Sequence, residues 1–124
     1  MSRTVLLTDS QKKLLPLTPA VFFVLLALAD GEKHGYAIMQ EVAVLSDQQV
    51  RMGPGTLYTT IQRLLDLALI AETAMAKSED SRRRYYRLTG AGRALLETEI
   101  ARMRAVLRVT RQKNLKPLEA KSAR

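Results

Sequence analysis

Hydrophobic residues in the first part of the chain recur with helical spacing, and residues that begin or end helices separate them. Thr18-Pro19 is typical of a helix start, because threonine can cap the free N–H groups and proline fits the first turn. The segment Ala20–Asp30 is apolar nearly all round, which predicts a buried helix that Gly31 ends. A second helix is expected from Gly35 to about Val44, with an apolar face of Ile38, Val42 and Leu45.

The segment Gly53–Gly55 interrupts the chain and opens a third helix, which is expected over Thr56–Leu67. One face of this helix is apolar, with residues at steps of three and four: Leu57, Ile61, Leu64 and Ala68. The opposite face carries no acid and presents small or hydrogen-bonding side chains: Thr56, Thr59, Thr60, Gln62 and Arg63. A face selected only for solubility usually mixes Glu and Lys, so this one is a candidate contact surface.

Two short stretches suited to β-strands follow, over Leu69–Ala76 and Arg83–Leu88. The polar residues 77–82 between them predict a β-hairpin with a charged tip. Thr89 is expected to cap a long helix that reaches about Asn114, although Gly90 and Gly92 weaken its first turn. An apolar stripe runs along this helix with a period close to that of helix–helix packing: Leu96, Ile100, Met103 and Leu107.

The order of these elements predicts a mainly α fold with a small β-hairpin: a winged helix-turn-helix plus a long C-terminal dimerisation helix. We expect residues 1–16 to form an N-terminal arm or short helix, from about Ser10 to Leu15. Residues 17–88 would form the winged-helix DNA-binding domain, residues 89–116 the dimerisation helix, and residues 117–124 a flexible tail.

Charge and composition narrow the class of partner. The net charge of the chain is +8, and the whole excess lies in residues 77–124, which hold fourteen Lys or Arg against five acids. A concentrated positive field of this kind attracts polyanions. The chain has no Cys and one His, so disulfides and thiolate metal sites are excluded and we expect no cofactor and no metal. The longest apolar run is half of a membrane span and no secretory pattern begins the chain, so we expect a cytoplasmic protein without a membrane partner.

Three motifs resemble, in the same order, those of the PadR family of transcriptional regulators: His34-Gly35-Tyr36-Ala37-Ile38, Gly55-Thr56-Leu57-Tyr58 with Arg63-Leu64, and Arg83-Arg84-Tyr85-Tyr86-Arg87-Leu88-Thr89 with Gly92-Arg93. The resemblance runs from about Leu17 to Leu96, and the short C-terminal part resembles the smaller subgroup of that family. It implies a winged-helix dimer that usually represses detoxification or efflux genes. A small aromatic effector often relieves this repression. One departure is Ala68, where family members commonly have Gly. Because a left-handed turn penalises Ala, the third helix is expected to end differently here.

DNA binding is the function that these residues favour, because the major groove admits one helix and a hairpin can place cations along a phosphate backbone. Arg82 and Arg84 are preferred to Arg83, since consecutive strand residues point to opposite faces. The candidate DNA-binding residues are Thr56, Tyr58, Thr59, Thr60, Gln62 and Arg63 on the third helix, Lys77, Arg82 and Arg84 on the hairpin, and Tyr36.

Several of these residues have a structural interpretation as well. Tyr58 resembles the DNA-proximal tyrosine of the family, but a half-buried tyrosine that packs the third helix onto the hairpin is an equal alternative. Tyr36 is expected in the core or near a phosphate rather than in an effector pocket. Of Tyr85 and Tyr86, one is expected to face the core and the other solvent. The single histidine, His34, stands before a helix and is expected to be a surface or capping residue.

The C-terminal stripe of Leu96, Ile100, Met103 and Leu107 is interpreted as a homodimer interface, and packing against the first helix of the same chain is the alternative. Two-fold symmetry would then predict an inverted-repeat operator. An effector pocket between the first and last helices would be apolar and could be lined by Phe22 or Phe23, although both are also suited to the core.

Two other classes of function compete with a DNA-binding repressor. An enzyme is disfavoured, because the acids are scattered and no nucleophile, base or dyad has an evident catalytic spacing. The alternative is a winged-helix module that binds RNA or a protein without small-molecule control. A hydrophobic or acidic face on the third helix would favour that alternative, and the face here is neither.

Overall fold

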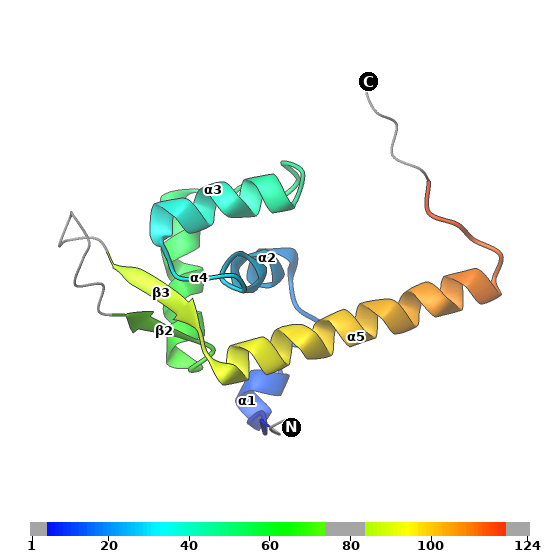
Figure 1. The fold of residues 1–124 in the computed structure, drawn as a ribbon, viewed down its shortest axis with the longest axis horizontal. Coiled ribbons are helices and arrows are strands. Elements are labelled where there is room, and N and C mark those ends of the chain that lie inside the picture. Colours follow the sequence, from blue (N-terminus) through cyan, green and yellow to red (C-terminus); the bar gives the residue numbers. More distant parts are fainter. Residues whose placement is uncertain (1–4, 74–83, 119–124) are drawn as a thin grey trace.

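The computed structural model describes residues 5–73 and 84–118, and Figure 1 shows their arrangement. A bundle of short helices packs beside a small sheet, and the last helix runs out from this body. The elements in chain order are α1 (Asp9–Lys12), α2 (Pro19–Ala27), β1 (Lys33–His34), α3 (Gly35–Leu45), α4 (Pro54–Asp66), β2 (Ile70–Thr73), β3 (Tyr85–Leu88) and α5 (Gly90–Gln112). The predicted fold class is confirmed: the chain is a mainly helical winged helix with a long C-terminal helix.

The helix starts lie where capping residues occur in the sequence. Thr18 accepts a hydrogen bond from the Val21 N–H, and Thr89 accepts one from the Gly92 N–H. His34 caps α3, because its Nδ1 accepts from the N–H of Ala37 at 3.2 Å. The expectation of a capping role for the single histidine is therefore confirmed, and each cap satisfies an N–H group that has no partner within its helix.

Helix α2 lies at the centre of the molecule, where it contacts both α3 and α5 (Figure 1). Val24, Leu25 and Ala27 are fully buried, which confirms the buried helix that the apolar run predicted. The helix ends at Ala27, three residues before the predicted end at Asp30. Its partners in the core come from every other long element: Ile38 and Val42 of α3, Leu57, Ile61 and Leu64 of α4, and Leu95 and Leu96 of α5.

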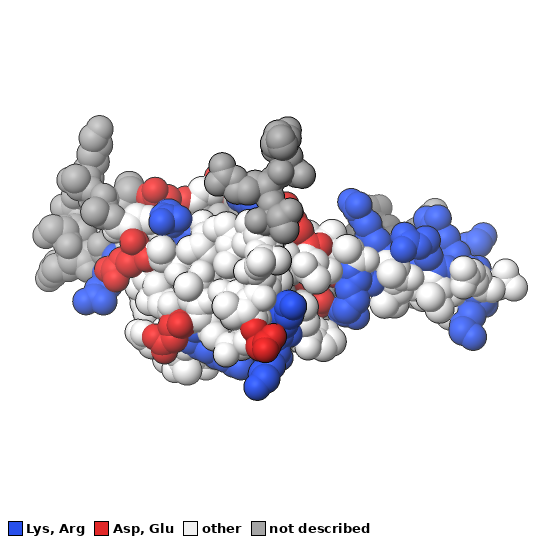
Figure 2. All heavy atoms as spheres, turned by 90° about the horizontal axis from the view of Figure 1, so that it is seen from below, with Lys and Arg blue, Asp and Glu red and all other residues white. Residues whose placement is uncertain are grey.

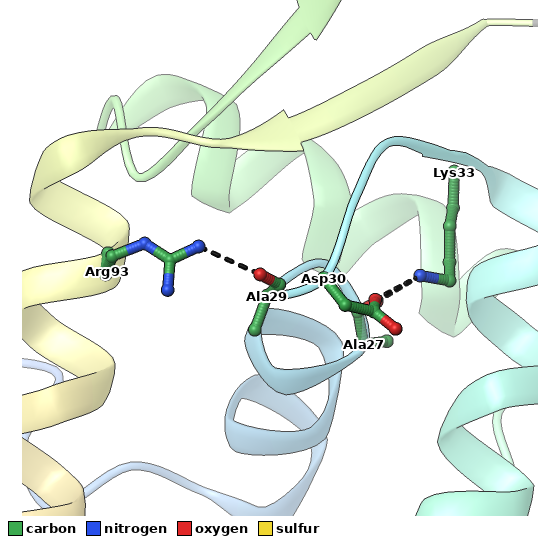
Figure 3. Close-up of polar contacts among 5 residues, drawn as sticks. All are labelled: Ala27, Ala29, Asp30, Lys33 and Arg93. Atoms are coloured by element: carbon green, nitrogen blue, oxygen red, sulfur yellow. Dashed lines mark hydrogen bonds and ion pairs between the residues drawn. The ribbon is translucent and has the colours of Figure 1, made fainter.

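Two cations from neighbouring elements bind the free carbonyls at the C-terminal end of α2, as Figure 3 shows. Lys33 of β1 donates to the Ala27 carbonyl and to the Asp30 carboxylate, both at 2.7 Å, and this contact lowers the pKa of Asp30. Arg93 of α5 donates to the Ala29 carbonyl at 2.9 Å. Positive charge is favourable at this end of a helix, so the two side chains join the sheet and α5 to α2.

The sheet has three strands in the order β1-β3-β2, whereas the sequence predicted a two-stranded hairpin. The β2–β3 hairpin is confirmed by its antiparallel register, in which Ile70 pairs with Leu88 and Thr73 with Tyr85. The additional strand, β1, pairs with β3 through Lys33 and His34 only. Two residues are too few to show an alternating pattern, which is why the sequence did not reveal β1.

The connection from α4 to β2 keeps the left-handed turn that the sequence analysis expected Ala68 to avoid. Ala68 has a φ of 59°, and its N–H and that of Leu69 donate to the Leu65 and Leu64 carbonyls. This pattern is a Schellman motif, which closes the helix end with two hydrogen bonds. The expectation of a different helix end was therefore wrong. Ala68 adopts the left-handed conformation despite its energetic cost for alanine. The hydrogen bonds that close the helix end come from backbone groups, which every residue except proline can supply.

Gly92 permits a close contact at the start of α5 that helix propensity alone did not predict. A Cβ atom at this position would overlap the carbonyl oxygen of Leu69 and approach Leu88 Cδ1 at 2.9 Å. The side chain of Thr89 also donates to the Ala68 carbonyl at 2.7 Å. The first turn of α5 thus lies directly against the α4–β2 connection, and only glycine allows this approach.

The N-terminal arm is attached to the body by one buried polar side chain and by leucines that pack against the core, Leu7, Leu14 and Leu15. Gln11 of α1 is 6% exposed, and its Nε2 donates to the Leu67 carbonyl at the end of α4 at 2.8 Å. The carbonyl oxygen of the same amide accepts from the Thr8 N–H at 2.9 Å, which completes a capping box. A short helix near the predicted position is confirmed, and it contacts the helix that carries the candidate DNA-binding face.

Helix α5 extends beyond the rest of the molecule (Figure 1) and ends at Gln112, two residues before the predicted end. Within residues 5–73 and 84–118, no helix is both long enough and apolar enough to cross a bilayer.

Candidate nucleic-acid interface

Helix α4 separates its apolar and polar residues onto two faces, as predicted. Leu57, Ile61 and Leu64 are buried in the core. The exposed residues are Thr56, Tyr58, Thr59, Gln62 and Arg63. Gly53 caps the helix without a side-chain hydrogen bond and Pro54 occupies the first turn, so the N-terminal end of α4 is built from backbone and small residues. The core therefore fixes α4 while its outer face stays open to solvent.

Thr60 differs from the other predicted contact residues. It is only partly exposed, and its hydroxyl donates to the Thr56 carbonyl of the preceding turn at 2.9 Å. This local hydrogen bond satisfies the hydroxyl within the helix. Thr60 is therefore the least available member of the set for an external partner.

The predicted face continues by one turn to an acid that the sequence analysis left out of it. Asp66 is exposed, and its Oδ1 accepts a hydrogen bond from Gln62 Nε2 at 3.0 Å. A shallow surface depression joins these residues to the start of the helix, and we call its lining the α4 face: Gly55, Tyr58, Thr59, Gln62, Arg63 and Asp66. This side of the helix is thus free of acids only up to Arg63.

Tyr58 combines an exposed surface with a structural contact. Its side chain is 49% exposed, while its phenol lies against Gly35, where an added Cβ would overlap the phenol oxygen. The residue therefore packs α4 against the start of α3, and it also lies close enough to Tyr86 of β3 to raise the pKa of that phenol. Tyr36 follows Gly35 and is 58% exposed, which excludes the core interpretation for that residue.

The hairpin contributes Arg84 next to the start of β3. Its Nε lies 3.7 Å from the Glu72 carboxylate of β2, and both side chains are largely exposed. Lys77 and Arg82, the other two predicted hairpin contacts, and Arg83 lie outside the described residues. Tyr86 is buried and Tyr85 partly exposed, as the alternation predicted. Burial raises the pKa of Tyr86, and the negative charge of Glu72 raises it further.

The apolar stripe of α5 is divided between two environments. Leu96 is 3% exposed and belongs to the core of its own chain, and Ile100 packs at the edge of that core. Met103, Val106 and Leu107 are exposed, and Leu107 is exposed by 51%. Leu96 and Ile100 thus pack within their own chain, which was the alternative interpretation of the stripe. Met103 and Leu107 remain available for a partner.

A buried carboxylate lies at the boundary between the two parts of α5. Glu99 is 1% exposed, and it accepts hydrogen bonds from the Leu17 N–H at 3.2 Å and from Arg102 Nε at 2.7 Å. The Arg102 hydrogen bond holds the pKa of Glu99 below its usual value despite the burial. The carboxylate therefore stays ionised and anchors α5 to the backbone that leads into α2.

Positive charge gathers on the outer part of α5. Figure 2 shows Lys and Arg side chains along this segment, whereas the acids lie on the globular body among other basic residues. The outer part of α5 and the segment after it, residues 100–118, contain six basic residues and no acid: Arg102, Arg104, Arg108 and Arg111 on the helix, and Lys113 and Lys116 beyond it. Much of the charge that predicted a polyanionic partner is thus on α5, and the α4 face itself carries one Arg and one Asp.

The two residues predicted to line an effector pocket both contact the core. Phe22 and Phe23 are partly buried against the core and meet edge to face, with ring centroids 5.2 Å apart. Both therefore serve the packing of α2 at least in part. Among the described residues, no three His, Cys, Asp or Glu side chains form a group that could hold a metal ion.

Comparisons with known proteins agree with this geometry. The family model described as the transcriptional regulator PadR-like family matches residues 24–98. The transcriptional regulator Rv3488 of Mycobacterium tuberculosis is 45% identical over 69 residues, which are 55% of this chain and 60% of that protein. An uncharacterized 37.1 kDa protein in transposon TN4556 of Streptomyces fradiae is 44% identical over 80 residues, 64% of this chain and 21% of that protein. The chain thus matches less than two thirds of the length of either relative.

Two solved structures have the same fold. A PadR family transcription regulator from Clostridium difficile superposes with a TM-score of 0.65 at 24% identity, covering 79% of this chain and 100% of that chain. BpsR of Bordetella bronchiseptica superposes with a TM-score of 0.60 at 28% identity, covering 90% of this chain and 73% of that chain. The BpsR structure concerns how 6-hydroxynicotinic acid regulates the DNA binding of that protein.

Proposed function

Because this chain belongs to the PadR-like family, a family of transcriptional regulators and not of enzymes, we propose that it is a sequence-specific regulator that binds double-stranded DNA. The observation that carries the proposal is the polar outer face of α4, held in place by the buried Leu57, Ile61 and Leu64. A helix of 13 residues is about 20 Å long and fits the major groove of B-DNA.

In this complex Gln62 and Arg63 read base edges, because both side chains are long, exposed and able to donate hydrogen bonds. Thr56, Thr59 and the phenol of Tyr58 contact phosphates near the N-terminal end of α4, with Tyr36 beside them. Thr60 contributes through its methyl group, since its hydroxyl is engaged within the helix.

The hairpin lies along the phosphate backbone and binds it through Arg84, with Lys77 and Arg82 from the segment outside the described residues. The Arg84–Glu72 pair is exposed and 3.7 Å long, and pairs of this kind contribute little to stability. Arg84 therefore exchanges Glu72 for a phosphate at little cost in free energy.

The regulator acts as a homodimer through the outer part of α5. Met103 and Leu107, together with Val106, are apolar side chains on a helix that extends into solvent, and a second copy of the same helix would bury them. A two-fold dimer presents two α4 faces to one side of a duplex, and its operator is an inverted repeat.

Repression and control by a small molecule complete the proposal. A dimer bound to a promoter excludes the transcription machinery, and an effector that binds the free dimer more tightly than the DNA-bound form relieves repression. Regulation of BpsR by 6-hydroxynicotinic acid supports a small aromatic or apolar effector. A thermal-shift screen of aromatic acids and apolar drug-like cations tests this: an effector raises the Tm and weakens operator binding, and a screen without any shift contradicts effector control.

The experiment that tests DNA binding measures the affinity of the purified protein for its own upstream DNA and for random duplex across a range of salt concentrations. We expect specific, salt-sensitive binding with two protomers per site. Weak and equal binding to all duplexes would contradict the proposal.

A substitution in the hairpin tests the phosphate contact. Arg84→Ala should weaken binding to all duplexes to a similar degree and reduce the slope of log K against log salt by about 1. The matched control is Arg87→Ala, which removes the same charge from an exposed position on β3. Equal effects of the two variants would show a general loss of charge and contradict a specific role for Arg84.

A further inference from the structure

We propose that Asp66 sets the base preference of the α4 face by holding the Gln62 carboxamide in one orientation. The inference rests on the proposed DNA-binding function and adds to it a residue that does not itself touch a base. Gln62 Nε2 donates to Asp66 Oδ1 at 3.0 Å, one turn further along α4, and both side chains are exposed beside Arg63.

Helix stability does not explain an aspartate at this position. Asp66 is the last residue of α4, where the helix dipole disfavours negative charge and a Lys or Arg would be favourable. Aspartate is also a weak helix former, and a Gln–Asp pair at this spacing gives only a small compensation.

The position of Asp66 also works against affinity for DNA. Asp66 lines the same surface depression as Tyr58, Thr59 and Arg63, so its carboxylate faces the side on which phosphates would lie. A negative charge there repels every duplex equally, whatever its sequence. A feature that lowers binding to all partners is useful when it improves the discrimination among them.

The gain in discrimination comes from the chemistry of the carboxamide. An unrestrained glutamine can rotate its amide by half a turn and exchange the positions of its donor and its acceptor. With one N–H bound to Asp66, Gln62 presents its second N–H and its carbonyl oxygen in a single order. A donor and an acceptor side by side match N7 and N6 of adenine in the major groove. Asp66 is thus a positioning residue, and adenine is the base that we expect Gln62 to read.

The test determines base preferences by selection from a randomised duplex library, followed by titration of single-base variants of the best site. For Asp66→Ala we expect the preference for A·T at one position of each half-site to fall about three- to tenfold. Affinity for unselected duplex should rise about twofold, because a negative charge is removed. Asp66→Asn keeps an acceptor oxygen without the charge, so it should show the same rise and retain most of the preference.

A double-mutant cycle separates positioning from a general effect of charge or folding. In the Gln62→Ala background, Asp66→Ala should leave the base preferences unchanged, since the side chain that Asp66 orients is missing. The inference is overturned if Asp66→Ala keeps the parent's preferences, or if it changes them equally when Gln62 is absent. A parent protein without any sequence preference would instead overturn the proposed function itself. Circular dichroism and Tm values matching those of the parent establish that each variant is folded.

Discussion

The first and second halves of α5 belong to one continuous helix, yet they have different relations to the rest of the chain. From Gly90 to Ile100 the helix packs against the α4–β2 connection and α2, and Leu95, Leu96 and Glu99 are buried. From Ala101 to Gln112 its large apolar residues are exposed and its charged residues are all basic. One apolar stripe therefore lies in two environments, because the body of the domain is shorter than the helix.

The largest effect is expected from filling the close contact in the first half. Gly92→Ala should lower the free energy of unfolding by about 3 kcal/mol, because the new Cβ overlaps the Leu69 carbonyl, which is backbone and cannot rotate away. The matched control is Gly90→Ala, where a Cβ would meet only Val5 Cγ2 at 4.0 Å, and stability should change little. Urea unfolding at one protein concentration measures both variants. Equal stability of the two would refute the close contact.

A substitution in the second half should affect association and leave the domain folded. Leu107→Glu places a charge among the exposed apolar residues of the proposed dimer interface, and we expect the dimer Kd to rise about 100-fold. Analytical ultracentrifugation over a range of concentrations measures this change. Gln112→Glu introduces the same charge at the end of the helix and should leave the Kd nearly unchanged. A Leu107→Glu variant as dimeric as its parent would place the interface elsewhere.

The boundary between the halves should give a smaller, pH-dependent effect. Glu99 has a pKa below its usual value of 4.5, chiefly because of the hydrogen bond from Arg102. A lowered pKa in the folded state means that the ionised carboxylate stabilises the fold above pH 4.5, and that this contribution disappears as the pH falls through the lower, folded-state pKa. Glu99→Gln should therefore be less stable than the parent by about 1 kcal/mol at pH 7, since solvent screens the partly exposed Arg102.

The stabilities of the parent and Glu99→Gln should converge as the pH falls below 4.5, which thermal unfolding between pH 3 and pH 7 can measure. Arg104→Gln is the control, because it removes a charge from an exposed position on the same helix. A constant difference between Glu99→Gln and the parent over this range would show that ionisation of Glu99 does not stabilise the fold.

Local signals in the sequence were sufficient for most of the fold. Thr18, His34 and Thr89 cap helices because a capping side chain bonds to an N–H three residues away. The two faces of α4 also follow from spacing alone. These interactions involve neighbours in the chain, so composition and periodicity are enough to predict them.

Contacts between distant segments were not predictable in the same way. The Gln11–Leu67 hydrogen bond joins residues 56 positions apart, and no sequence pattern around Gln11 predicts it. Arg93 and Lys33 were counted among the charges of the chain, but their partners are carbonyls at the end of α2. Glu99 did leave a signal, since it is an acid three positions after Leu96 on the apolar side of the helix. An acid in such a position indicates a buried partner.

The candidate site shows the same division. The polar side chains of the α4 face up to Arg63 were predicted from the sequence, because the spacing of apolar residues in an amphipathic helix indicates which side is exposed. Three interactions could not be seen in the sequence. The Thr60 hydroxyl donates to a carbonyl of its own helix, Tyr58 packs against Gly35, and Asp66 accepts a hydrogen bond from Gln62. Each of these depends on rotamers and on the approach of two helices, which spacing does not specify.

The family, the order of the helices and the hairpin, and the exposed face of α4 follow from the amino-acid sequence, because each is encoded by motifs or by periodicity within one segment. The third strand β1, the backbone contact at Gly92 and the division of the α5 stripe after Ile100 became visible only in the folded chain. These features depend on where separate segments meet in space. Packing geometry and backbone hydrogen bonds between distant residues set those meeting points, and a linear pattern does not contain them.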